Sequence, residues 1–240
     1  MKPVVILVHG SLDRGASFSR SILRLTDTAV VSYDRRGYQG SRGMNLTGGF
    51  RSHLDDFFAL AEAANEGHGV VAIGHSFGGD LVQAAALERP DLVAALGAYE
   101  PPMPWIGFHR HSSGSWPSLA SDPGDEAEQF FRRMVGDAAW DRLSDGLRED
   151  RRADGPALVV DLSAIRTLQF DPTLLTMPSH FGSGTTKTAP HHRDTVEWLG
   201  ANVPGARVTW FDDSGHGAHL THPDAFARFI EQVRDSAPGS

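Results

Sequence analysis

The sequence predicts an α/β domain with a mainly parallel sheet, and three observations support this fold class. Short apolar runs, bounded by Gly, Asp or Pro, recur along the 240-residue chain. Longer segments with the spacing of amphipathic helices separate these runs. The runs are continuous rather than alternating, which is typical of strands buried on both faces of a parallel sheet. Alternation of strands and helices in this way indicates a doubly wound arrangement.

Six apolar runs are the expected strands. They occupy residues 4–8, 29–33, 69–73, 93–99, 172–177 and 206–211. Their lengths are those of ordinary strands in globular proteins. Because helical segments separate them, we expect a sheet of about six strands, nearly all of them parallel.

Helical spacing fills the gaps between several of these strands. Leu, Phe, Ala and Val recur at helical intervals in residues 54–64, 80–87 and 195–201. Further along, an apolar stripe follows Pro223, a residue type favoured at the first position of a helix. The stripe consists of Ala225, Phe226, Phe229, Ile230 and Val233. We therefore expect an amphipathic helix after Pro223.

Residues 101–169 break this alternation, because no run in them has the pattern of a strand. The stretch 108–123 is rich in Ser, Gly, Pro and His and is expected to be a loop. Helical spacing of apolar residues then returns. We interpret residues 101–169 as a mostly helical cap inserted into an α/β core that consists of residues 1–100 and 170–240.

Composition excludes several classes of protein. With 22 basic and 30 acidic side chains the net charge is −8, so the chain lacks the excess of Lys and Arg that binds nucleic acid or anionic membranes. Hydrophobic residues (40%) and charged residues (22%) are at the levels of folded rather than disordered chains. The absence of Cys excludes disulfides, zinc–thiolate sites, iron–sulfur clusters and a thiol nucleophile.

The first apolar run is not expected to be a signal peptide. Residues 4–8 are too few for the hydrophobic segment, and His9-Gly10 follows in place of a small-residue cleavage site. No other stretch approaches the roughly 20 uninterrupted apolar residues of a membrane span. We expect a cytoplasmic protein that acts on a small ester-like molecule, without nucleic-acid or membrane partners, and its oligomeric state is open.

The most specific motif is Gly-His-Ser-Phe-Gly at residues 74–78. It follows an expected strand and precedes an expected helix, which is the setting that a nucleophile elbow requires. The turn is so tight that Gly is needed on both sides, and it projects the Ser76 hydroxyl above the sheet. At the start of the helix, the Phe77 N–H and the helix dipole favour a developing negative charge. An ordinary glycine-rich turn with a serine cap is the alternative.

Three further turns follow expected strands. They are His-Gly-Ser at 9–11, Asp-Arg-Arg-Gly-Tyr-Gln-Gly-Ser at 34–41 and Ser-Gly-His-Gly at 214–217. In this order, and together with residues 74–78, they resemble the α/β-hydrolase superfamily, specifically its small serine esterase-like members. The resemblance covers nearly the whole chain apart from residues 101–169.

The resemblance implies a fold and roles for individual residues. It implies the α/β-hydrolase fold with a helical cap, here with a shortened sheet that lacks the N-terminal hairpin common in the family. Ser76 would be the nucleophile and His216 its general base. The N–H groups of Phe77 and Ser11 would form the oxyanion hole. Gln39 stands where the family turn usually has Gly, which is a minor departure.

The third member of the expected triad is the main departure. The family normally places Asp after the fifth strand, but residues 178–193 hold no carboxylate. Some family members, notably haloalkane dehalogenases, take the acid from the end of the preceding strand, where Glu100 lies here. A carboxylate on the His Nδ1–H fixes the tautomer and stabilises the imidazolium. We therefore favour Glu100 over a merely structural Glu-Pro-Pro turn, with Asp194, Asp171 and a bare Ser–His dyad as alternatives.

The histidines and aromatic residues have two interpretations each. His216, His219 and His222 are evenly spaced, but no His-Glu-x-x-His pattern is present, so we expect no metal and no other cofactor. Five aromatic residues either line an apolar substrate pocket or hold the cap on the core. They are Trp105, Phe108, Trp116, Phe130 and Trp140. Trp105, Phe108 and Trp140 are our candidate substrate-binding residues.

The sequence thus predicts a serine hydrolase that cleaves a small carboxylic ester or lactone through an acyl-enzyme on Ser76. The same residues serve C–C bond hydrolases, hydroxynitrile lyases and perhydrolases of the superfamily, so these activities stay open. A non-catalytic member that binds a small ligand is a further alternative.

Overall fold

A single sheet organises the computed structural model, which describes residues 2–108 and 118–239. The strand order is β2-β1-β3-β4-β5-β6, and every neighbouring pair is parallel. The strands are β1 (Val5–Val8), β2 (Val30–Ser32), β3 (Val70–His75), β4 (Val93–Tyr99), β5 (Ser179–Gly184) and β6 (Arg207–Phe211). The predicted parallel α/β sheet of six strands is confirmed.

The fifth strand was predicted in the wrong place. Residues 172–177 hold only a short 3-10 turn, Pro172–Leu174, and the strand begins at Ser179 instead. Its sequence, Ser-His-Phe-Gly-Ser-Gly, has no apolar run. Neighbouring atoms leave no room for a side chain at Gly182 and Gly184. A Cβ on Gly182 would lie 3.0 Å from ring atoms of Phe211 and Tyr99. Tertiary packing therefore overrides local strand preference here.

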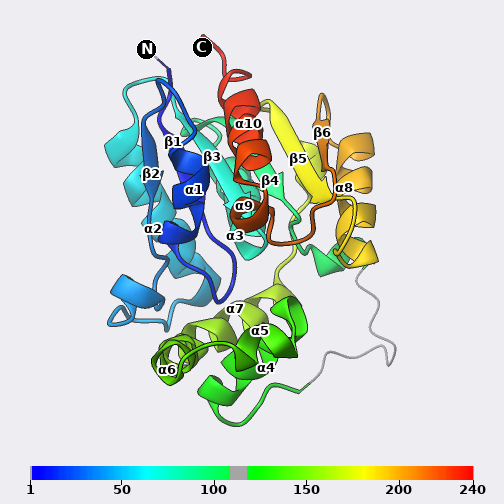
Figure 1. Cartoon of the computed structure of the whole chain (residues 1–240). Helices are drawn as coiled ribbons and strands as arrows, with labels where there is room; N and C mark the ends of the chain where they lie inside the picture. Colours follow the sequence, from blue (N-terminus) through cyan, green and yellow to red (C-terminus); the bar gives the residue numbers. More distant parts are fainter. Residues whose placement is uncertain (1, 109–117, 240) are drawn as a thin grey trace.

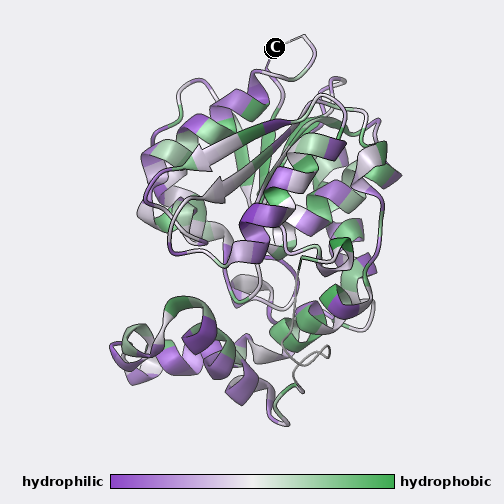
Figure 2. Ribbon diagram, turned by 90° about the vertical axis from the view of Figure 1, so that its right-hand side faces the viewer, coloured by the Kyte–Doolittle hydropathy of each residue, from purple (hydrophilic) through white to green (hydrophobic). Residues whose placement is uncertain are grey.

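Ten helices are found in the described residues. They are α1 (Ser19–Ile22), α2 (Gly49–Ala64), α3 (Phe77–Glu88), α4 (Pro123–Val135), α5 (Asp137–Asp141), α6 (Asp145–Ala153), α7 (Gly155–Thr167), α8 (Pro190–Asn202), α9 (Ala218–Thr221) and α10 (Pro223–Arg234). Many carry hydrophilic residues on one side and hydrophobic residues on the other (Figure 2). None of these helices has the length and apolar character needed to cross a membrane.

Helices cover both faces of the sheet, as the continuous apolar strands require. Val5 and Leu7 of β1 belong to a buried cluster with α1 and α10, which lie on one face (Figure 1). Ile6 and Val8 belong to a second cluster with α2, α3 and α8. The alternation of side chains along β1 therefore divides the core into two layers.

Helices α4 to α7 lie between β4 and β5 in the chain and below the sheet in Figure 1, while both termini lie at its top. We call residues 118–169 the helical insert; within them the structure contains helices and turns and no strand. The chain runs from β1 to the edge strand β2 and then back to β3 on the other side of β1. Such a reversal of strand order creates a crevice at the carboxyl ends of the strands, which is where open α/β sheets bind ligands.

Candidate active site

Ser76 occupies a strained turn between β3 and α3. Its backbone has φ = 53° and ψ = −125°, a conformation that residues other than Gly rarely adopt. The turn closes so tightly that a Cβ on Gly74 would lie 2.0 Å from the Gly78 carbonyl oxygen. A Cβ on Gly78 would in turn lie 2.2 Å from the carbonyl oxygen of Val8. Both flanking glycines are therefore required for the geometry that a nucleophile elbow has.

His216 lies in the turn that follows β6, and its backbone is fixed from two sides. The Tyr99 hydroxyl donates to the Gly215 carbonyl (2.8 Å), and His75 Nε2–H donates to the His216 carbonyl (2.7 Å). Ser76 and His216 both line one cavity of about 460 Å³. No hydrogen bond joins their side chains in the described structure; such contacts often tighten only when substrate binds.

Glu100 is the carboxylate that meets His216. It follows β4 directly, is completely buried, and its Oε2 lies 2.7 Å from His216 Nδ1. The Ser183 hydroxyl and the Gly184 N–H donate to Oε1, each at 2.9 Å, and the Thr188 hydroxyl donates to Oε2 at 2.8 Å. These four contacts come from three different segments of the chain and hold the carboxylate in one orientation.

The electrostatics of Glu100 follow from the same contacts. Burial acts to raise its pKa. The hydrogen bond and the charge of His216, together with hydrogen bonds from the Gly184 N–H and the Thr188 hydroxyl, lower the pKa and outweigh the effect of burial. The net result is a pKa below the ordinary value, so Glu100 is ionised at neutral pH. An ionised Glu100 must accept from His216 Nδ1–H, which leaves the Nε2 lone pair of the imidazole available as a base.

The two rival carboxylates lie elsewhere. Asp171 is at the surface and caps the turn at Pro172–Leu174 by accepting from the Thr173 N–H at 3.0 Å. Asp194 is exposed on α8. Of the three acids considered from the sequence, Glu100 is thus the one that the described structure places against His216.

Two backbone N–H groups adjoin Ser76. Gly10 lies so close to it that a Cβ on Gly10 would be 2.9 Å from the Ser76 Cβ, which places the turn after β1 beside the nucleophile turn. Ser11 follows Gly10 and lines the same cavity as Ser76. Neither the Ser11 N–H nor the Phe77 N–H donates a hydrogen bond within the described residues. Both are therefore open to an oxyanion.

A buried ion pair, missed from the sequence, braces the turn that contains Ser11. Arg35 is fully buried; it donates to the carbonyls of His9 (3.0 Å) and Gly10 (3.1 Å) and to both oxygens of Asp161. Asp161 of α7 also accepts from the Ser11 hydroxyl at 2.8 Å. Burial acts to raise the pKa of Asp161, but Arg35 and His53 outweigh it and the pKa is strongly lowered. The helical insert thus reaches into the site through this carboxylate.

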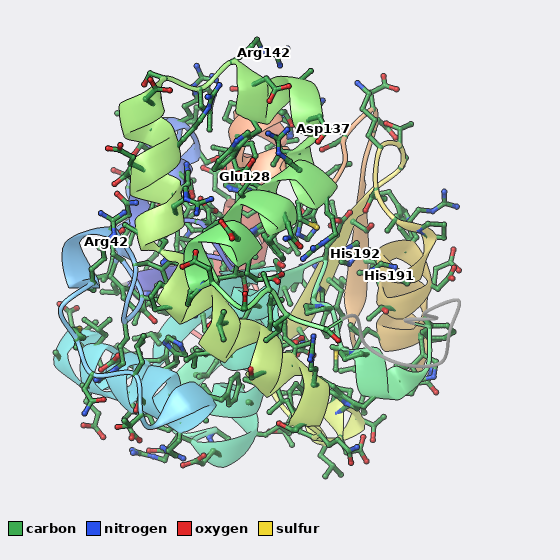
Figure 3. All side chains as sticks on the ribbon, turned by 90° about the horizontal axis from the view of Figure 1, so that it is seen from below. Arg42, Glu128, Asp137, Arg142, His191 and His192 are labelled. Carbon is green, nitrogen blue, oxygen red and sulfur yellow. The ribbon has the colours of Figure 1, made fainter. Side chains whose placement is uncertain are left out.

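Four histidines gather around Ser76 and Glu100. The His192 ring of α8, labelled in Figure 3, stacks on His216 at 4.6 Å between centroids. The ring centroids of His75 and His219 lie 4.3 Å apart. Burial, followed by the nearby His219 and His216, lowers the pKa of His75 well below its ordinary value, so its imidazole is neutral.

Two groups of these side chains could hold a metal ion. Ligand atoms of Asp13, His75 and His219 lie within 4.8 Å of one another, and so do those of Glu100, His192 and His216. In both groups, two of the potential ligand atoms already form a hydrogen bond with each other. His219 Nε2 contacts Asp13 at 3.1 Å, and His216 contacts Glu100 at 2.7 Å. A metal would have to replace these bonds, including the one that orients His216.

The wall of the cavity differs from the prediction. Its apolar side consists of residues from one face of α4, namely Phe130, Phe131, Met134 and Val135. Trp105 packs on Phe170 and donates to its carbonyl at 3.0 Å, and Trp140 packs on Phe131 (5.4 Å between centroids). Neither lines the cavity, and nor does the half-buried Phe108. Trp116 lies outside the described residues.

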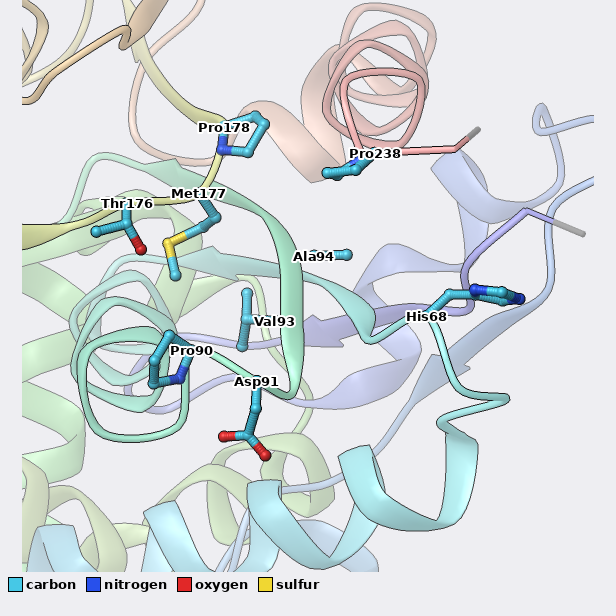
Figure 4. Close-up of a pocket in the computed structure, with 9 residues that line it drawn as sticks. All are labelled: His68, Pro90, Asp91, Val93, Ala94, Thr176, Met177, Pro178 and Pro238. Carbon is cyan, nitrogen blue, oxygen red and sulfur yellow. The ribbon is translucent and has the colours of Figure 1, made fainter.

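A second hollow lies at the opposite end of the strands (Figure 4). Its volume is about 290 Å³, and it is lined by residues that precede β3, β4 and β5, by the first two residues of β4, and by Pro238. Because ligands of open α/β sheets bind at the carboxyl ends of the strands, we place the site at the cavity that contains Ser76.

Comparison with known proteins identifies the family of the chain. A family model described as "Alpha/beta hydrolase family" matches residues 5–229. Polyketide synthase ThaQ of Burkholderia thailandensis is 28% identical over 93% of this chain, which spans only 11% of that protein. Lipase LipV of Mycobacterium tuberculosis is 28% identical over 57% of this chain and 51% of its own length.

Solved structures share the whole fold. An alpha/beta hydrolase from Sphaerobacter thermophilus superposes with a TM-score of 0.70, over 95% of this chain and 91% of its own, at 24% sequence identity. The parallel sheet with its nucleophile-elbow turn, the matched family model and this superposition lead to one conclusion. The chain belongs to the α/β hydrolase family.

Proposed function

We propose that the protein is a serine hydrolase that cleaves small carboxylic esters or lactones through an acyl-enzyme on Ser76. The observation that carries the proposal is the hydrogen bond between buried Glu100 and His216, because it leaves the imidazole Nε2 free in a cavity that also contains Ser76. The similarity to a lipase supports hydrolysis of an ester. Residues 101–169 act in this proposal as a cap that shapes the cavity.

In the proposed reaction His216 Nε2 accepts the Ser76 proton while Ser76 Oγ attacks the ester carbonyl. Negative charge develops on the carbonyl oxygen, and the N–H groups of Ser11 and Phe77 stabilise it. The imidazolium, paired with ionised Glu100, then gives its proton to the departing alkoxide. Water releases the acid from Ser76 by the same steps in reverse.

The test is hydrolysis of a panel of 4-nitrophenyl esters, with Ser76→Ala compared with wild type. We expect wild type to turn over short- and medium-chain esters, and Ser76→Ala to lose kcat by at least about 10⁴-fold, as removal of a serine nucleophile does in other enzymes. Ser163→Ala is the matched control, because Ser163 is exposed on α7, does not line the cavity, and its hydroxyl donates to the Val159 carbonyl of the same helix.

Labelling with a fluorophosphonate provides a second measurement that does not depend on the choice of ester. Stoichiometric modification of Ser76, located by peptide mass spectrometry, requires an activated nucleophile. Labelling without ester turnover would favour C–C bond hydrolysis, lyase or perhydrolase chemistry at the same site. Failure of both labelling and turnover would favour a ligand-binding member and contradict the proposal.

A further inference from the structure

Arg151 of α6 lines the cavity beside the nucleophile without an anionic partner. One of its amino groups donates to the Leu12 carbonyl at 3.1 Å. No carboxylate oxygen within residues 2–108 and 118–239 lies within 4.0 Å of its guanidinium. A guanidinium has five N–H donors, so four of them have no partner in the described structure.

The three carboxylates that act electrostatically on Arg151 already have other partners. Asp13 accepts from the Ser17 hydroxyl at 3.0 Å and contacts His219 at 3.1 Å. Asp150 forms ion pairs with Arg14 at 3.4 Å and with Arg42 at 2.7 Å. Asp154, the remaining one, accepts from Arg42 at 2.6 Å and from the Gln39 side chain. In the described structure these three carboxylates are directed at these partners, and none of them forms an ion pair with Arg151.

The surroundings also disfavour an unpaired cation. Burial, followed by repulsion from Arg14, lowers the pKa of Arg151 below its ordinary value and outweighs the attraction of nearby carboxylates, although Arg151 stays charged at neutral pH. Arg35 is a structural guanidinium that is buried with an anionic partner, because Asp161 pairs with it through both carboxylate oxygens. Arg151 lacks such a partner at a point where a bound ligand can supply one.

A second cation lines the same cavity. Lys187 lies in the loop between β5 and α8, is exposed, and has no carboxylate of the described chain within 4.0 Å. Two carboxylates also line the cavity: Asp13, which contacts His219 at 3.1 Å, and Asp213, which is exposed; neither forms an ion pair with Arg151 or Lys187 in the described structure. The apolar residues of α4 form another part of the wall. An organic acid with an apolar chain would match both features.

We propose that Arg151, assisted by Lys187, binds a carboxylate carried by the substrate, so that the preferred substrates are anionic esters. This inference rests on the proposed hydrolase function and adds a substrate class to it. A carboxylate accepts two parallel hydrogen bonds from a guanidinium, which fixes the orientation of the ester as well as binding it. The reacting carbonyl would then be presented to Ser76 in a single direction.

A purely structural role for Arg151 predicts a different result. Its bond to the Leu12 carbonyl lies next to Ser11, so loss of the side chain could shift the Ser11 N–H. That shift would slow neutral and anionic esters equally. Loss of a carboxylate-binding group slows only the anionic ester. A matched pair of substrates therefore separates the two roles.

The experiment compares mono-4-nitrophenyl adipate with 4-nitrophenyl hexanoate, which have acyl chains of equal length. A second pair, 4-acetoxybenzoate and its methyl ester, places the carboxylate on the leaving group instead. The variants are Arg151→Gln and Lys187→Gln. Arg142→Gln is the matched control, because Arg142 is an exposed cation of the helical insert, lies at its outer edge in Figure 3, and does not line the cavity.

We expect wild type to prefer the anionic member of at least one pair by about 10-fold or more in kcat/KM. Arg151→Gln should reduce kcat/KM for that anionic ester by about 10- to 100-fold, mainly through KM, and change the neutral ester by less than about 3-fold. Lys187→Gln should have a smaller effect and Arg142→Gln none. Equal rates within both pairs for wild type, or a parallel loss in Arg151→Gln, would overturn the inference.

Binding of adipic acid monoamide, measured by calorimetry, tests the anion site independently of ester hydrolysis. If no ester is hydrolysed, the hydrolase proposal fails, but wild type should still bind this anion at least about 10-fold more tightly than Arg151→Gln does. Equal affinity of the two proteins would overturn the anion site, whatever the outcome of the kinetic assays.

Discussion

Among the fully buried carboxylates near the nucleophile turn, Asp161 and Glu100 differ in the partner that each one faces. Asp161 faces Arg35, whose charge is permanent, and the two are joined through both carboxylate oxygens. Glu100 faces His216, whose imidazole can be neutral or protonated. Both carboxylates have lowered pKa values despite burial, which alone would raise them.

The difference separates a structural ion pair from one that the reaction creates. The charge pair of Arg35 and Asp161 is present in every state of the folded protein and holds the turn that contains Ser11. In the proposed mechanism, the charge pair of Glu100 and His216 exists only while the imidazole holds the Ser76 proton. Removing Asp161 should therefore act mainly on stability, and removing the charge of Glu100 mainly on catalysis.

The largest expected effect is that of Glu100→Gln on catalysis. Gln keeps the size of the side chain but removes the charge, and its amide favours the wrong imidazole tautomer. We expect kcat to fall by about 10³- to 10⁴-fold, as it does when the acid of other triads becomes an amide. The measurement is hydrolysis of the best 4-nitrophenyl ester, with near-wild-type circular dichroism as the check on folding.

The same variant also tests the assignment of the acid. Asp194→Asn is a suitable control, because Asp194 is exposed and does not contact His216. Its activity should stay within about 2-fold of wild type. If Glu100→Gln retained most of its activity, a Ser–His dyad would replace the triad in the proposed mechanism.

Asp161→Asn should give the largest loss of stability. It leaves the Arg35 guanidinium buried without an anion, and breaking a buried pair in this way costs about 3–5 kcal/mol of unfolding free energy. Urea denaturation of Asp161→Asn and Glu100→Gln tests the comparison directly. The Glu100 variant should lose less stability, because it leaves no permanently charged guanidinium buried without an anion. Equal losses would mean that both pairs are structural.

How much of this arrangement could be predicted from the sequence depended on how local each signal was. The turn at Ser76 has its requirements within five consecutive residues, 74–78, so its place in the fold was correctly predicted. Glu100 could be proposed because it ends a recognisable apolar strand. Strand β5 was misplaced, since Gly182 is required by the rings of Tyr99 and Phe211 and Gly184 by the Ser214 carbonyl, contacts that local sequence does not reveal.

The remaining features depend on contacts between distant segments. Arg35 and Asp161 are 126 positions apart, and only the folded chain brings them together. The signal that could have indicated Asp161 is a carboxylate in the middle of the mainly apolar helix α7. The aromatic residues of the cavity wall were incompletely identified because periodicity shows that α4 has an apolar face, but not that this face lies over Ser76.

The smallest expected effect concerns His9, which sharpens the contrast between the two sides of the site. Its Nδ1–H donates to the Gly10 carbonyl (2.7 Å), and its Nε2 accepts the Arg35 N–H (2.8 Å). Burial, and then the charge of Arg35, lower the pKa of His9 from 6.5 to about 3. An imidazole beside the permanent cation thus stays neutral, whereas His216 beside Glu100 is placed to accept a proton.

This contrast predicts a pH dependence of stability. Below pH 6.5 the unfolded chain protonates His9 and the folded chain does not, so protons favour unfolding. Between about pH 6 and 4, His9 should lower the unfolding free energy by about 1.4 kcal/mol for each unit by which the pH falls. His9→Gln retains a donor and an acceptor but cannot titrate, so its stability should fall less steeply than that of wild type by that amount. Urea denaturation at several pH values measures the slope of unfolding free energy against pH for wild type and for His9→Gln. Identical slopes would mean that His9 is already protonated in the folded protein. In that case the cation Arg35 does not keep its neighbouring imidazole neutral.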